Sequence, residues 1–312
     1  MQGMPGQKQG SAPLSLSIRL PAMNGRFYPE NPDACRALVR EYLQRALIYE
    51  EPPEKRRLLG GIVPHAGWIC SAALAGQTIA AIAASRAGSA PDLVVVFGAV
   101  HSAMPIDRAA LDSHDVWRVP TGDSIIARQL VLQLAESPSQ QFQVDDRFHE
   151  MEHAVEVELP LIQGAWPEAK LLPIELPAIE SAVEIGIETA RLIQSARMDA
   201  VYLASSDLTH YGPAYGFTPA GIGSAALDWA LANDRRLLAK VTAMQAEEIV
   251  PEVRARLNAC GGGAIAAMLA ACREYGATAG HLLRHTNSYQ ALADTHPQRS
   301  DNAVGYAAVV VG

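Results

Sequence analysis

Short apolar runs alternate with Ala- and Leu-rich stretches along this chain, and this alternation restricts the folds open to it. Strands that alternate with helices predict a largely parallel sheet covered on both faces. We therefore expect an α/β fold with three αβα layers around a largely parallel, mixed sheet. The predicted strands lie at 58–63, 92–100, 170–176, 199–205 and 305–311, and the predicted helices include 33–47, 73–84 and 262–275.

The chain is long enough for one large core or two modest ones, with 312 residues of which 49% are hydrophobic. Residues 1–17 are rich in Gly, Pro, Ser and Gln, and we expect them to form a disordered lead-in. No linker, repeat or low-complexity run divides the remainder. The economical interpretation is a single domain over residues 18–312.

Charge and cysteine usage exclude several classes of function. The chain has 25 Lys plus Arg against 33 Asp plus Glu, a net charge of −8, so no nucleic-acid partner is expected. Cys35, Cys70, Cys260 and Cys272 form no C-x-x-C pair, which excludes a zinc ribbon or a thioredoxin-type motif. The first 20 residues contain no continuous apolar segment of signal-peptide length, and no stretch of the sequence approaches the 18 apolar residues of a membrane span. We therefore expect a cytoplasmic protein without a membrane segment.

Histidines directly follow three of the predicted strands. His65 follows the first apolar run, His101 follows the second, and Ser206, Asp207 and His210 follow the fourth. Ligands of such sheets bind outside the carboxyl ends of the strands. A lone histidine in a loop is more often a surface or hydrogen-bonding residue, but three at one edge of a sheet indicate a shared site.

Cys260 stands at a turn before a predicted helix, in the sequence Cys-Gly-Gly-Gly. The glycines are typical of a flexible turn, and a phosphate nest is an unspecific alternative. Cys70 and Cys272 lie in or beside apolar helical stretches and are expected to be core cysteines. Two imidazoles and one thiolate would hold Fe(II), Zn(II) or reduced copper.

The H-E-x-x-H pattern of zinc proteases occurs between His149 and His153. On a helix these two side chains would share a face and could bind one metal. A zinc protease also needs a third protein ligand, and Pro160 limits a regular helix downstream. A zinc hydrolase that acts through His149 and His153 is therefore the weaker alternative. In the other interpretation, Glu152 and Glu156 are acidic neighbours of His153, which is then available for proton transfer.

The sequence Asp-Ser-His-Asp at 112–115 contains the residue types of a hydrolase triad. Adjacent residues of a strand point to opposite faces, so we do not expect a triad among these four. The Ser-Ser-Asp sequence at 205–207 lacks the G-x-S-x-G pattern of a nucleophile elbow. Neither segment predicts a nucleophilic serine.

Seven ordered motifs cover about residues 18–312. They are GRFYP (25–29), PHAGW (64–68), GAVH (98–101), EHAVEVELP (152–160), SSDLTHYG (205–212), CGGGAI (260–265) and the final NAVGYAAVVV. In this order they resemble the Memo family, whose bacterial and archaeal members are called AmmeMemoRadiSam system protein B. His149 and Glu150 lie outside the segment that matches.

The Memo family is similar in fold to class III extradiol dioxygenases, so the resemblance implies a dioxygenase-like fold here. Those enzymes bind non-haem Fe(II) through two histidines and a carboxylate. The resemblance implies that His65 and His101 are metal ligands and that Cys260 takes the place of the carboxylate. It also implies that His210, with Asp207 beside it, is a catalytic acid or base.

The same resemblance implies that His153 is a second catalytic histidine. Glu156, an acidic neighbour of His153, and Ser206, after the fourth predicted strand, are predicted supporting residues. The implied cofactor is one metal ion, Fe2+ or Cu+, with Zn2+ also possible. The implied activity is metal-dependent oxidation with O2 of a small molecule or modified peptide. The alternative is a non-catalytic metal-binding or protein-interaction module that works with radical-SAM and AMMECR-type proteins. The sequence leaves open the substrate, the native metal, turnover and the oligomeric state.

The chain departs from the family pattern beside the cysteine. The family motif usually reads C-G-R-x-P-I, whereas Gly262 and Ala264 replace the Arg and the Pro here. A fixed cation beside the pocket is therefore missing, and an anionic substrate of relatives need not be shared.

Overall fold

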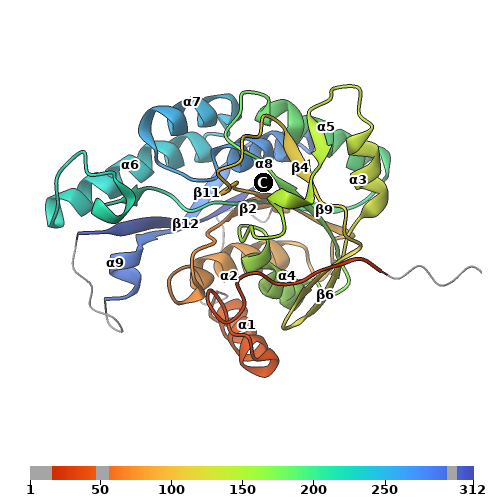
Figure 1. The fold of residues 1–312 in the computed structure, drawn as a ribbon, viewed down its shortest axis with the longest axis horizontal. Coiled ribbons are helices and arrows are strands. Elements are labelled where there is room, and N and C mark those ends of the chain that lie inside the picture. The colour runs from red at the N-terminus through yellow and green to blue at the C-terminus, as the bar shows by residue number, and fades with distance from the viewer. Residues whose placement is uncertain (1–15, 47–55, 294–300) are drawn as a thin grey trace, which may run out of the picture.

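The computed structural model describes residues 16–46, 56–293 and 301–312, and within these residues nine strands form one central sheet (Figure 1). Its four central strands are parallel and almost fully buried, as their Val, Ile, Leu and Ala content predicts. In sheet order they are β2 (Gly60–Val63), β9 (Ala200–Ser205), β3 (Leu93–Gly98) and β8 (Lys170–Glu175). Residues 1–15 of the predicted lead-in lie outside the described residues.

Further strands extend the sheet at both edges. β12 (Ala303–Val311) runs antiparallel to β2, and β11 (Gly280–Asn287) and β10 (His210–Tyr211) run antiparallel to β12. On the other side, β4 (Ala109–Leu111) runs antiparallel to β8, and β7 (Phe142–Val144) runs parallel to β4. The sheet is therefore mixed, with a parallel centre.

Helices cover both faces of the sheet and give the fold its three layers (Figure 1). On one face, α8 (Gly262–Glu274) packs on β2, β3 and β9, and α5 (Ala182–Ser195) and α7 (Ala246–Arg256) pack on α8. On the other face, α2 (Trp68–Ser85) packs on β2 and β12 and is covered by α1 (Pro32–Ala46). The predicted three-layer αβα fold with a largely parallel, mixed sheet is confirmed.

Further elements surround this core. Beside it lie α4 (Leu159–Ala165) on α1 and α2, α3 (Arg128–Ala135) on β7, α6 (Ser224–Thr242) on β11 and β12, and α9 (Ser288–Ala291) after β11. Three short strands, β1 (Ile18–Arg19), β5 (Val116–Val119) and β6 (Gly122–Ile125), form a separate small sheet. The 3-10 turns are η1 (Asp146–Phe148), η2 (Glu156–Glu158) and η3 (Pro213–Tyr215).

Helix α2 differs from the sequence-based expectation that no segment could span a membrane. Among the helices of the described residues, it is long and apolar enough to do so, with 18 residues and a mean hydropathy of 1.4. However, 61% of the helix is buried inside the fold, between α1 and the sheet. Its composition is that of a core helix, because both of its faces contact other elements.

Candidate metal centre

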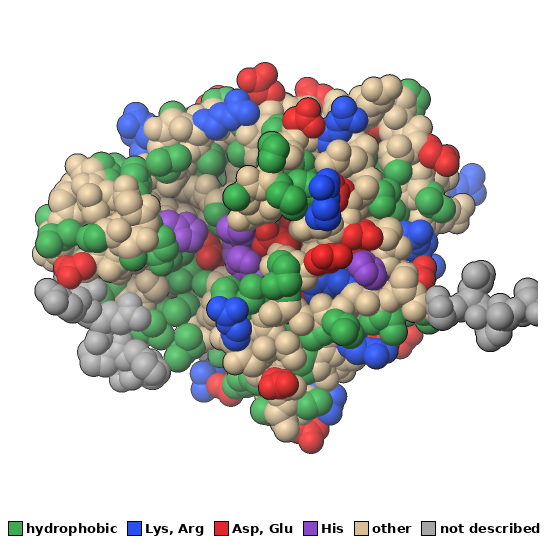
Figure 2. Space-filling view, viewed as in Figure 1, with side chains coloured by type: hydrophobic (Ala, Val, Ile, Leu, Met, Phe, Trp, Pro, Cys, Tyr) green, Lys and Arg blue, Asp and Glu red, His purple; other side chains and the backbone are tan. Residues whose placement is uncertain are grey.

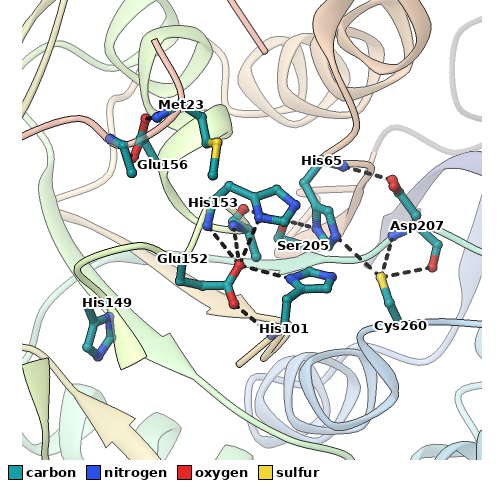
Figure 3. A network of polar contacts seen from close by, with 12 residues as sticks. Met23, His65, His101, His149, Glu152, His153, Glu156, Ser205, Asp207 and Cys260 are labelled. Carbon is teal, nitrogen blue, oxygen red and sulfur yellow. Dashed lines mark hydrogen bonds and ion pairs between the residues drawn. The ribbon is translucent and has the colours of Figure 1, made fainter. Parts of the chain in front are cut away.

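Histidine side chains lie close together near the middle of one face of the molecule (Figure 2). They meet there because β2, β3 and β9 are parallel and end at the same edge of the sheet. His65 follows β2, His101 follows β3, and Asp207 follows β9, while Cys260 precedes α8 on the adjoining face. Figure 3 shows the side chains of His65, His101 and Cys260 directed toward one another, with the Asp207 backbone beside the Cys260 sulfur.

The three predicted metal ligands form a compact group, which we call the pocket cluster. It consists of His65, His101 and Cys260, whose potential ligand atoms all lie within 4.8 Å of one another. The Cys260 Sγ lies 3.3 Å from the His65 Nε2, and the two imidazole rings are 5.1 Å apart between centroids. The predicted convergence of these three residues is therefore confirmed.

Hydrogen bonds fix the tautomer of His65. The Ser205 hydroxyl donates to the Ala154 carbonyl at 2.5 Å, so its oxygen accepts from the His65 Nδ1 at 2.8 Å. The His65 Nε2 is then left with a free lone pair that faces the sulfur of Cys260. Burial, followed by the neighbouring His101, keeps the pKa of His65 well below its usual value. His65 is therefore a neutral imidazole, the form that binds metals.

Glu152 orients His101 in the same way. The His101 Nδ1 donates to the Glu152 Oε1 at 2.9 Å, and its backbone N–H donates to the Oε2 at 2.7 Å. Burial would raise the pKa of Glu152, but hydrogen bonds from His101 and His153 outweigh it and lower that pKa. Metal-ligating histidines commonly donate their second N–H to such a carboxylate.

His101 is protonated in the metal-free chain. Burial lowers its pKa, but hydrogen bonds to Cys260 and Glu152 outweigh burial and raise the pKa to about 11. A proton on the His101 Nε2 thus occupies the position that faces Cys260. A cation bound there would replace this proton, so metal binding would release it.

His153 lies beside His101 but outside the pocket cluster. Its Nδ1 and backbone N–H both contact the Glu152 Oε1, at 3.1 and 2.7 Å. Its ring stacks on His101 with centroids 4.5 Å apart and contacts Phe27 edge-on at 4.9 Å. One carboxylate oxygen therefore aligns two imidazoles, and the His153 Nε2 has no hydrogen-bond partner among the described residues.

Glu156, predicted as a supporting residue, contacts the N-terminal segment of the described residues. The backbone N–H groups of Ala22 and Met23 donate to its carboxylate at 2.8 Å, and the Tyr28 hydroxyl donates at 2.6 Å. Arg19 pairs with the same carboxylate, and both side chains are almost fully buried. Glu156 thus fixes the N-terminal segment, and this segment places Phe27 against the ring of His153.

Asp207 contacts both His65 and Cys260. Its Oδ1 accepts from the His65 backbone N–H at 2.9 Å, and its own backbone N–H donates to the Cys260 Sγ at 3.3 Å. Burial raises the pKa of Asp207 to about 7, against hydrogen bonds from the His65 backbone. Ser206, the second predicted supporting residue, accepts from the Gly261 N–H at 2.9 Å and so holds the turn after Cys260.

His210 lines the same pocket from β10. Burial, followed by the positive charge of His101, lowers its pKa to about 4. The pocket has a volume of about 420 Å³. Its polar wall is formed by His65, His101, His153, Asp207 and His210, and its other walls by Phe27, Ala66, Gly67, Cys70, Tyr215, Ser288, Leu292, Val304 and Tyr306.

His149 does not join His153 at a metal. The H-E-x-x-H segment is a turn between η1 and η2 rather than a helix, so its two histidines do not share a helix face. His149 is fully buried, with its Nε2 3.1 Å from the Ala110 carbonyl and its ring against Trp117. Figure 3 shows it apart from the other histidines. The zinc-hydrolase alternative is not supported by this geometry.

The Asp-Ser-His-Asp segment lies in a loop between β4 and β5, so the strand geometry assumed for it is wrong. The His114 Nδ1 bonds the Asp112 Oδ1 at 2.8 Å, whereas the Ser113 hydroxyl bonds Asp146 instead. The expected absence of a triad holds for a different reason, because the serine is turned away from the histidine. Asp112, His114 and Asp146 form what we call the loop cluster, with potential ligand atoms within 4.8 Å.

The glycines after Cys260 allow close packing. A Cβ on Gly263 would lie 2.0 Å from the Pro177 carbonyl oxygen, and one on Gly261 would lie 2.7 Å from the Ser206 Cβ. The start of α8 therefore fits against the strand ends only without side chains there.

Sequence reasoning missed Ser205 and Glu175. Ser205 is the last residue of β9 and pairs in register with Val63, two residues before His65, which is the signal that could have found it. Glu175 ends β8 as a fully buried acid whose carboxylate oxygens have no hydrogen-bond partner among the described residues. An acid at the end of an apolar strand is the corresponding signal.

The fold and the site define a three-layer α/β protein with a His–His–Cys cluster at the carboxyl edge of its sheet. Residues 19–310 match the family described as Memo-like protein. A MEMO1 family protein of Methanosarcina barkeri is 30% identical over 298 residues, covering 94% of this chain and 100% of the relative. One from Methanococcoides burtonii is 31% identical over 302 residues with the same coverage. The chain belongs to the Memo family, and the resemblance seen in its motifs is confirmed.

Proposed function

We propose that this chain binds one transition-metal ion through the pocket cluster and uses it in the O2-dependent oxidation of a small molecule or modified peptide. The observation that carries the proposal is the orientation of His65 and His101. Each has its Nδ1 bonded to protein, and the two rings and the sulfur converge on one point beside a pocket. Such second bonds fix ligand histidines in proteins that hold metals.

The donor set fits soft or borderline metals. Two imidazole nitrogens and a thiolate suit Fe(II), Cu(I) and Zn(II), and the sulfur favours copper more than a carboxylate would. A bound metal of this kind would supply redox or Lewis-acid chemistry to O2 and substrate. The thiolate in place of the carboxylate of dioxygenases makes classical ring cleavage a poor fit.

The remaining pocket residues would handle protons. His210 is neutral near pH 7 because its pKa is lowered to about 4, so it can accept a proton from a bound substrate. Asp207, with its pKa raised to about 7, can hold or release a proton near neutral pH. His153 presents a free Nε2 to the same pocket.

The test is anaerobic titration of wild type, Cys260→Ser and Cys260→Asp with Cu(I) and Fe(II). Serine should weaken both metals, and aspartate should shift the preference toward Fe(II). Cys70→Ser is the matched control, because Cys70 lines the same pocket but lies outside the cluster. Equal binding by wild type and both Cys260 variants would show that Cys260 is not a ligand.

Oxygen uptake by the iron- and copper-loaded protein tests the second half of the proposal, with loaded Cys260→Ser as the blank. If wild type binds neither metal, the binding-module alternative replaces the oxidoreductase. Pull-down with radical-SAM and AMMECR-type proteins would then be the next measurement. Metal binding without O2 uptake on any tested substrate would support a non-catalytic metal-binding role.

A further inference from the structure

The loop that carries Asp207 and His210 is anchored by a buried carboxylate from a distant helix. Asp234 lies on α6, is only 1% exposed, and accepts the Thr209 backbone N–H on its Oδ1 at 2.9 Å. Its Oδ2 accepts from the His285 Nε2 on β11 at 2.9 Å. Both oxygens of this carboxylate are therefore used, one on the loop and one on a histidine that does not line the pocket.

The packing around Asp234 leaves little room for movement. A Cβ on Gly305 would lie 2.2 Å from the Asp234 Oδ2, so β12 approaches the carboxylate closely. The Gly305 N–H donates to the Thr209 carbonyl at 3.0 Å, and the Leu208 N–H donates to the Gly305 carbonyl at 2.8 Å. The Thr209 backbone is thus held on its N–H by Asp234 and on its C=O by β12.

The same turn of α6 also holds the chain before Cys260. The Asn233 side chain donates to the Arg256 carbonyl at 3.0 Å, and the Asn258 side chain donates to the Asn233 carbonyl at 3.1 Å. Asn258 precedes Cys260 by two positions. One helical turn therefore fixes two loops that are distant in sequence.

These two loops meet at the sulfur of Cys260. The Asp207 N–H donates to the Cys260 Sγ at 3.3 Å, and the Cys260 N–H donates to the Asp207 carbonyl at 3.3 Å (Figure 3). The N–H···S bond depends on where Asp207 lies, and Asp207 lies two residues before the Thr209 amide that Asp234 holds. Hydrogen bonds to a ligand sulfur tune the electronic properties of the metal.

We propose that Asp234, supported by His285, is a positioning residue that aligns the Asp207 N–H with the Cys260 sulfur and so tunes the metal–sulfur bond. The inference rests on the proposed function in that Cys260 is taken as a metal ligand. Asp234 acts through the backbone and touches neither the pocket nor the pocket cluster. Its effect should therefore be seen at the sulfur rather than in the number of metals bound.

The experiment loads Co(II) anaerobically and follows the thiolate-to-cobalt charge-transfer band. Asp234→Ala should still bind one Co(II) per chain, with a shifted band and an affinity weaker by up to about 10-fold, the lower end of the loss for a residue that bonds a ligand directly. Asp234→Asn should lie closer to wild type, because the amide oxygen can still accept the Thr209 N–H. Asp228→Ala, an exposed position on the same helix, should match wild type.

A folded Asp234→Ala protein with the wild-type band and affinity would overturn the inference. If Asp234→Ala does not fold, His285→Leu tests the inference instead. A smaller shift of the charge-transfer band in the same direction would support the positioning role of Asp234, and a wild-type band would overturn it. If wild type binds no Co(II), the proposed function has failed. Hydrogen exchange of the metal-free protein then decides whether Asp234 holds the loop, since Asp234→Ala should speed exchange of the Thr209 amide.

Discussion

The pocket cluster and the loop cluster both bring three potential ligand atoms within 4.8 Å of one another, yet their hydrogen bonds differ. In the pocket cluster, the second nitrogen of each histidine is bonded to Ser205 or Glu152, outside the cluster. In the loop cluster, the His114 Nδ1 bonds Asp112, which is itself a cluster member. Proximity alone therefore does not separate a metal site from an internal hydrogen-bond network.

The remaining oxygens of the loop cluster are also occupied. The Trp117 Nε1–H donates to the Asp112 Oδ2 at 2.7 Å, and Ser113 donates to both oxygens of Asp146. Strand direction contributes as well, because β4 is antiparallel to β8 and directs Asp112 away from the carboxyl edge of the central strands. A free ligand atom at the correct edge of the sheet is what distinguishes the pocket cluster.

The largest contrast is expected from one histidine in each cluster. His65→Ala should lower metal affinity by more than about 100-fold, because loss of a ligand exceeds the 10-fold to 100-fold cost of losing an outer partner. His114→Ala should leave affinity within about twofold of wild type. Metal content after anaerobic dialysis measures both. A comparable loss of metal affinity in His114→Ala would indicate that a metal binds in the loop cluster. His149→Ala should keep its metal, as wild type does.

A second prediction concerns the carboxylate that aligns His101. Glu152→Gln keeps the shape of the side chain but removes the charge that holds two imidazole N–H groups. We expect metal affinity to fall by about 10-fold to 100-fold, as for other carboxylates behind ligand histidines. Competition with a chelator of known affinity measures the change. Wild-type affinity in this variant would show that the tautomer of His101 does not depend on Glu152.

The sequence predicted the central strands and the ends at which His65 and His101 lie, because buried parallel strands are continuous apolar runs. It did not predict β4, which has three residues, or its reversed direction, since composition is the same for either direction. The H-E-x-x-H motif is misleading for a tertiary reason. Arg19 donates to the backbone carbonyls of His149 and Glu152 and holds that segment in a turn, a contact across more than a hundred residues.

The types of metal ligand at the site could be predicted from the sequence. The residues that hold these ligands in position could be predicted less well. Cys260 was placed by family resemblance rather than by spacing. The hydroxyl of Ser205 and the shared oxygen of Glu152 determine which nitrogens are free, and no local pattern shows this. Such partners depend on strand register and on loop geometry, which the sequence specifies only through the complete fold.

The third prediction tests whether the loop cluster is structural. Asp112 is fully buried and accepts from the Trp117 indole and from His114. Asp112→Ala leaves these groups without partners, so we expect a loss of about 2 kcal/mol in the free energy of unfolding. Urea unfolding measures it, with Asp115→Ala on the same loop as a half-exposed control. A fully stable Asp112→Ala protein would contradict the structural role.

The smallest effect is expected at Glu175, which interacts electrostatically with both clusters. Burial, followed by the nearby Glu152, raises its pKa well above the usual value, and Asp112 of the loop cluster adds to this. Its Oε2 would lie 2.1 Å from a Cβ on Gly98, so the carboxyl fills the space that this glycine leaves free. The native protein therefore keeps Glu175 protonated at a pH where the unfolded chain has released the proton.

The sign of the pH dependence follows from linkage. Below the usual pKa of glutamate both states hold the proton, so Glu175 carries no penalty there. As the pH rises above that value, the unfolded state loses its proton first, and the free energy of unfolding falls until the native pKa is passed. Glu175→Gln cannot ionise and lacks this loss. The variant should gain stability relative to wild type as the pH rises above about 5, just past the usual pKa of glutamate, measured by urea unfolding. A difference that does not change as the pH rises would mean that Glu175 is already ionised in the native protein.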